Sequence, residues 1–215
     1  LPLAVRLAQG WWEGCSNERA TALFTSEEFP ERLQRAFAVQ TSKLHFVPQA
    51  VDMVERICGP NRPFGQAEVL LSERGSELFR SLVKLNPTAT ASALTAILGS
   101  LEHEDLIGIE GNVRRNLVWA LEGLAFWRDT FAPAAALLLH FAAAENESWS
   151  NNATGLFLQL FHLFLAGTQA DYDHRREVIE IGLGSEVWKR REVAIQALGS
   201  ALQTHSFSRM MGSER

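Results

Sequence analysis

The strongest constraint on this fold is the helical spacing of apolar residues through the second half of the chain. Leucine, valine, phenylalanine and alanine recur three and four residues apart, which is the spacing of one face of an α-helix. The connections between these segments are short, and short connections make consecutive helices antiparallel neighbours. The sequence therefore predicts helices over residues Val113–Trp127, Phe131–Ala144, Asn151–Ala166, Tyr172–Leu183 and Glu186–Gln203.

The first half of the chain carries shorter segments of the same kind. They begin or end at signals such as Pro48, Gly59-Pro60 and Asn86-Pro87. Asn61–Gly65 is the best internal linker because it contains Arg62-Pro63 between two glycines. We therefore expect a helical linker segment over residues 1–60 and a helical-repeat domain over residues 61–215.

One stretch favours strand over helix. Leu106-Ile107-Gly108-Ile109 is β-favourable, and Gly111-Asn112 supplies a turn. A small β hairpin near residues 106–112 is therefore one interpretation, and an ordered loop is the other.

An imperfect internal repeat suggests how the helices are arranged. The segments that follow Arg114-Arg115 and Arg190-Arg191 share small and aliphatic residues on one face and a glycine near the end, at a separation of about 76 residues. That is close to two repeats of about 40 residues, the length of HEAT-like helix pairs. We predict an all-α fold of stacked antiparallel helix pairs, a HEAT-like α-solenoid, although any two amphipathic helices share part of this pattern.

Composition excludes several classes of protein. Hydrophobic residues make up 47% of the chain and the net charge is -5, so the chain is neither disordered nor a general nucleic-acid binder. The longest apolar runs are shorter than the roughly 20 residues that span a bilayer, so we expect no membrane association. Two cysteines and no export signal indicate a reduced, cytoplasmic protein. Seventeen arginines against three lysines fit a GC-rich, bacterial genome, and the two chain ends suggest a piece of a longer polypeptide.

The motifs of common enzymes and cofactor sites are missing from the sequence. There is no phosphate-binding Gly-rich loop ending in Lys, no Gly-x-Ser-x-Gly elbow and no Cys/His cluster with zinc spacing, so we expect no cofactor, metal or catalytic residue. Glu102-His103-Glu104-Asp105 could in principle hold a metal, but consecutive residues point in different directions. Asp171 and Asp173, next to His174, are more simply acids in the first turn of a helix.

Paired arginines at the starts of predicted helices are the candidate binding residues. In stacked repeats they could form a basic strip for phosphate groups or an acidic partner, or they could form ion pairs between repeats. Tryptophans that are hard to bury, among them Trp149 and Trp188, could mark contact with another domain. The candidate residues are Arg114, Arg115, Arg175, Arg176, Arg190, Arg191, Trp11 and Trp12.

The first eight residues carry a resemblance to a known family. Leu1-Pro2-Leu3-Ala4, followed by Val5, Leu7 and Ala8, resembles the Gly-Leu-Pro-Leu-Ala motif of STAND-class (NB-ARC-type) signalling NTPases. In that family the motif opens a helix that follows the nucleotide-binding core, and Pro2 would lie near the bound adenine. The resemblance implies that the remaining chain is a downstream region of helical repeats, and that the parent is a bacterial multidomain sensor of the kind found in antiviral defence.

Three functions remain open from the sequence. The first is a non-catalytic scaffold or sensor segment whose partners are the other domains of its own polypeptide or a protein ligand. The second is a nucleic-acid-binding helical module that uses the paired arginines. The third is a helical enzyme with an acid–His site.

Overall fold

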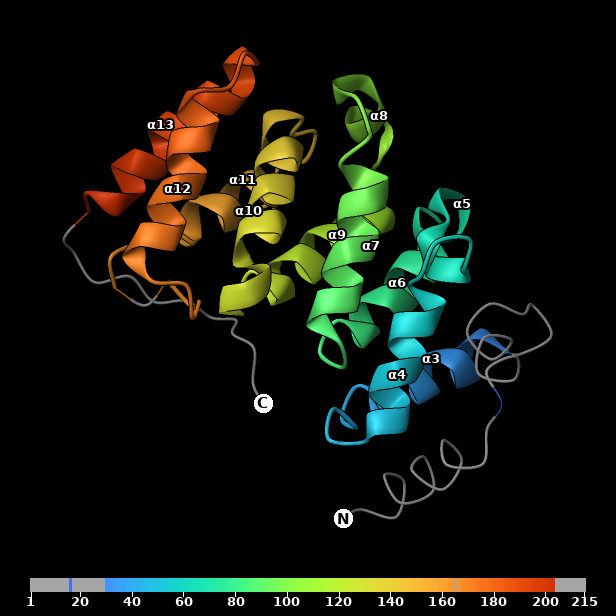
Figure 1. Ribbon diagram of the computed structural model, residues 1–215. Helices are drawn as coiled ribbons and strands as arrows, with labels where there is room; N and C mark the ends of the chain where they lie inside the picture. Colours follow the sequence, from blue (N-terminus) through green and yellow to red (C-terminus); the bar gives the residue numbers. More distant parts are fainter. Residues whose placement is uncertain (1–15, 17–29, 165, 204–215) are drawn as a thin grey trace. The chain divides into compact units, whose positions relative to one another are not determined.

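The computed structural model describes residues 16, 30–164 and 166–203. Within these residues the chain is all-α, with eleven α-helices, one 3-10 helix and no strand (Figure 1). It divides into two compact units, residues Leu1–Ile97 and Leu98–Arg215. The Gly59–Gly65 turn lies inside the first unit, where η1 (Pro63–Gly65) packs against α4 (Pro48–Ile57) and α5 (Ala67–Leu70).

The first unit is built from short helices around an aromatic core. Phe64 and Phe79 are fully buried and meet edge to face, with ring centroids 5.6 Å apart. α3 packs against α6, and α5 packs against both η1 and α6. Its helices are α3 (Glu31–Thr41), α4 (Pro48–Ile57), η1 (Pro63–Gly65), α5 (Ala67–Leu70), α6 (Glu73–Leu82) and α7 (Pro87–Leu98).

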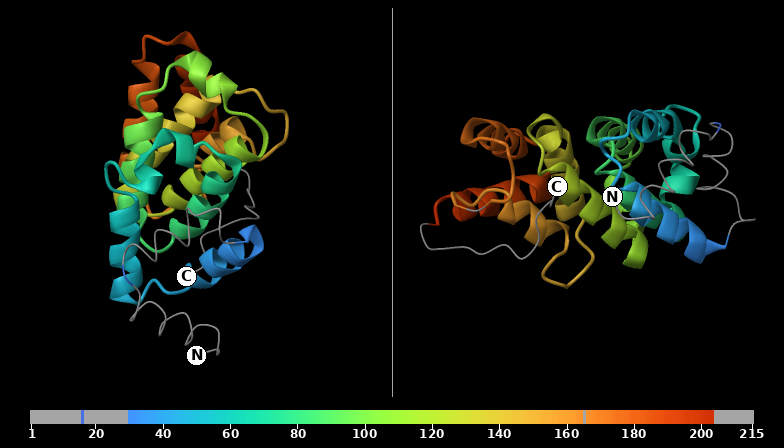
Figure 2. Two further views of the ribbon diagram at one scale, coloured as in Figure 1. Left: turned by 90° about the vertical axis from the view of Figure 1, so that its right-hand side faces the viewer. Right: turned by 90° about the horizontal axis from the view of Figure 1, so that it is seen from below.

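The second unit is arranged around one central helix, α10 (Arg128–Ala143). α10 contacts α8 and α9 on one side and α11, α12 and α13 on the other. In both figures α12 and α13 lie on the side of α10 away from α8 and α9 (Figures 1 and 2). The remaining helices are α8 (His103–Gly108), α9 (Gly111–Leu124), α11 (Ala153–Gln159), α12 (Tyr172–Leu183) and α13 (Trp188–Ala201).

Local signals in the sequence set where many of these helices begin. The Ser72 hydroxyl accepts a hydrogen bond from the Gly75 amide at 2.9 Å, and the Asn152 side chain accepts one from the Gly155 amide at 2.8 Å. Asp171 accepts from the His174 amide at 3.1 Å. Each side-chain oxygen satisfies an amide that has no partner within its own helix, which is why helix starts favour these residues.

The β hairpin suggested near residues 106–112 is wrong. Leu106 lies in α8, whose first turn is closed by a 3.1 Å hydrogen bond from the Glu102 amide to the Asp105 carboxylate. Gly111 has φ of +58° and begins α9 directly afterwards. A local cap and a glycine in the left-handed region therefore outweigh the β preference of three aliphatic residues.

The helix predicted to run to Ala166 is also wrong in its second half. α11 ends at Gln159, and Phe164 is 62% exposed instead of enclosed. The Arg175 guanidinium donates hydrogen bonds to the carbonyls of Leu160 and His162. These two carbonyls are therefore satisfied without a further turn of helix. The apolar composition of this segment predicted a helix buried on all sides, but the chain leaves the helix after Gln159.

No helix within the described residues is both long enough and apolar enough to cross a membrane.

Candidate functional site

Arg114 is buried inside the second unit. Its side chain is 1% exposed, and its guanidinium donates to the carbonyls of Leu106 and Ile109 at 2.8 and 3.3 Å. It also donates to the carbonyls of Phe141 and Ala144 at 2.8 and 2.9 Å. These carbonyls belong to the last turns and caps of α8 and α10, where the helix dipoles place partial negative charge.

Two further contacts hold this charge inside the fold. A Glu145 carboxylate oxygen lies 3.4 Å from the guanidinium, and the Phe141 ring centroid lies 4.9 Å from it. Burial lowers the pKa of Arg114, and the nearby Glu145 charge opposes that shift. Arg114 therefore ties two helix ends together and presents no charge at the surface.

Arg115 points to a different neighbourhood from Arg114. Its guanidinium carbon lies 4.6 Å from the ring centroid of Trp149 and 5.9 Å from that of Trp119. Both tryptophans and the arginine are half-buried. The three side chains form a cation–π cluster, which holds the loop carrying Trp149 against α9.

The pair in α12 is also engaged within the fold. Arg175 is half-buried and donates to the His162 carbonyl at 2.8 Å, close to where α11 ends. Arg176 is exposed and lies within 4 Å of two acids on its own helix, Asp173 at 3.8 Å and Glu180 at 3.7 Å. Exposed pairs of this length contribute little to stability.

In the α13 pair, too, one arginine donates hydrogen bonds to backbone carbonyls. Arg191 donates to the carbonyls of Ser185 and Glu186 at 2.6 and 3.2 Å, and its guanidinium lies over the Trp188 ring. Arg190 is half-buried, and its charge helps to lower the pKa of His140 to about 4, after the larger effect of burial. In each of the three pairs, one arginine caps a preceding segment of chain.

The other sequence candidates do not gather into a site. Trp11 and Trp12 lie outside the described residues. Asp171 caps α12, is 2.6 Å from the His174 ring nitrogen and is 3.0 Å from Arg128. These contacts lower the pKa of Asp171, with the hydrogen bonds from His174 as the main cause. Among the described residues, no group of three or more His, Cys, Asp or Glu side chains is placed to hold a metal ion.

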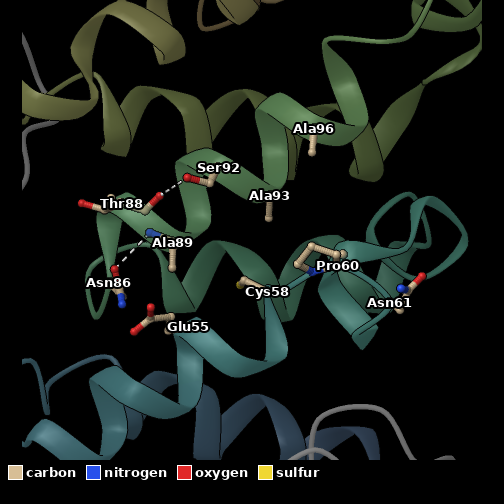
Figure 3. A pocket seen from close by; sticks show the side chains of 12 residues that line it. Glu55, Cys58, Pro60, Asn61, Asn86, Thr88, Ala89, Ser92, Ala93 and Ala96 are labelled. Atoms are coloured by element: carbon tan, nitrogen blue, oxygen red, sulfur yellow. Dashed lines mark hydrogen bonds between the residues drawn. The ribbon is translucent and has the colours of Figure 1, made fainter.

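A groove of about 720 Å³ runs along α7 in the first unit (Figure 3). Its polar groups are largely used inside the fold, since Asn86 accepts from the Ala89 amide and the Ser92 hydroxyl donates to the Thr88 carbonyl. Burial raises the pKa of the Cys58 thiol to about 12, so this sulfur is not a nucleophile near neutral pH. The groove is lined by Glu55, Cys58, Gly59, Pro60, Asn61, Gly65, Asn86, Thr88, Ala89, Ser92, Ala93 and Ala96.

The most unusual surface is the outer face of α13. Its inner face is buried, with Val193, Ala194 and Ala197 between 0% and 5% exposed. A stripe along its exposed side is also apolar, beside the polar Lys189, Glu192 and Gln196, and an apolar stripe of this kind is suited to contact with another surface. We call this stripe the outer seam, and it consists of Trp188 (60% exposed), Arg191, Ile195 (55%), Leu198 (40%) and Leu202 (73%).

The sequence predicts only part of the outer seam. Trp188 and Arg191 stand out as single candidate residues, whereas the spacing of three, four, three and four residues from Trp188 to Leu202 is a separate signal. That spacing was present in the sequence and could have been found. The sequence does not show which apolar residues of α13 are buried, because this depends on how α13 packs against α10, α11 and α12.

Comparison with known protein families, curated proteins and solved structures gives no match to this chain.

Proposed function

We propose that this chain is a non-catalytic helical scaffold that binds protein through the outer seam of α13. The single observation that carries the proposal is that α13 has an apolar stripe of four large side chains exposed to solvent in addition to its buried apolar face. Burying one large aliphatic side chain fully contributes about 1.5–3 kcal/mol, so covering four half-exposed apolar side chains favours a protein partner.

The packing of the second unit supports an arrangement of stacked helix pairs. α12 and α13 pack together, and both contact α10, so the pair covers one side of that helix. In a HEAT-like solenoid each pair is covered by the next in the same way. The outer seam has the composition of a surface between two such pairs.

The resemblance of Leu1–Ala8 to STAND-class signalling NTPases gives this scaffold a context. A cytoplasmic bacterial sensor of that class would use the repeats to couple recognition of a trigger to its nucleotide-dependent switch, in antiviral defence for some members. Binding at the outer seam would shift the packing of helices toward the state that the partner binds more tightly.

The paired arginines give little support to nucleic-acid binding. Arg114 is buried, and Arg175 and Arg191 donate to backbone carbonyls. A phosphate would have to displace these hydrogen bonds. The acid–His alternative is equally unsupported, since Asp171 caps a helix and bonds to Arg128.

Photo-crosslinking in the expressing cell tests the proposal. A photoreactive phenylalanine at Ile195, in the outer seam, is compared with one at Asp52, which is exposed on α4. We expect protein adducts from position 195 that disappear when Leu198→Glu and Leu202→Glu are added, and none from position 52. Equal adducts from both positions, or no adduct from position 195, would overturn the proposal.

A further inference from the structure

We draw no further inference here: the strongest candidate, the groove of about 720 Å³ along α7 in the first unit, carries none because its polar groups are largely used inside the fold and nothing among the described residues shows what occupies it.

Discussion

Replacing Arg114 should destabilise the second unit more than any other single arginine substitution. The guanidinium makes four hydrogen bonds to carbonyls at 2.8–3.3 Å from a side chain that is 1% exposed. Hydrogen bonds to a charged group contribute about 1.5–3 kcal/mol each, but burying the guanidinium offsets much of that sum. Breaking a buried charged network by removing one partner costs about 3–5 kcal/mol, so we expect about 4 kcal/mol for Arg114→Ala.

Two variants make the measurement specific. Arg114→Lys keeps the charge but cannot reach two helix ends with one ammonium, so it should cost about 2–3 kcal/mol. Arg115→Ala removes the neighbouring arginine, whose cation–π contacts are worth about 1 kcal/mol or less. Urea unfolding followed by tryptophan fluorescence reports mainly on the second unit, since four of the six tryptophans lie in its range: Trp119, Trp127, Trp149 and Trp188.

The results can refute the reasoning in two ways. If Arg114→Ala costs no more than Arg115→Ala, the carbonyl contacts do not stabilise the ends of α8 and α10. If added salt removes much of the difference in unfolding free energy between Arg114→Ala and the wild type, the contribution of Arg114 comes from exposed charges and not from a buried network.

Three further outcomes follow from individual side chains. Gly182→Ala should lower the free energy of unfolding by about 1–3 kcal/mol in a thermal melt, because a Cβ there would lie 2.8 and 3.1 Å from neighbouring side-chain carbons. The control Gly108→Ala meets no atom within 4 Å and should not destabilise the protein. Because folding lowers the pKa of His140 from 6.5 to about 4, its contribution is complete above pH 6.5 and is lost as the pH falls toward 4, so His140→Gln should flatten the acid unfolding curve in this window. In a Cys15→Ser chain, Cys58 should resist a thiol reagent at pH 8 until urea unfolds the protein, since its pKa is about 12; rapid labelling of the native chain would contradict this.

The local sequence determined where most helices lie. Apolar spacing and capping residues act within one or two turns, so they can be recognised without knowledge of the fold. Tyr172–Leu183 was predicted with the bounds that the structure has, and α9, α10 and α13 differ by a few residues at their ends. The prediction for α11 was wrong because a residue distant in sequence changes the local structure: Arg175 donates to carbonyls at and just beyond the end of α11.

Only the tertiary structure decided what the candidate residues do. The sequence placed six arginines at helix starts, and nothing in it separated the buried Arg114 from the exposed Arg176. That difference depends on whether carbonyls from other helices converge on the side chain. In the same way, the sequence showed that α13 is rich in apolar residues, but only its packing against α10, α11 and α12 left the outer seam uncovered.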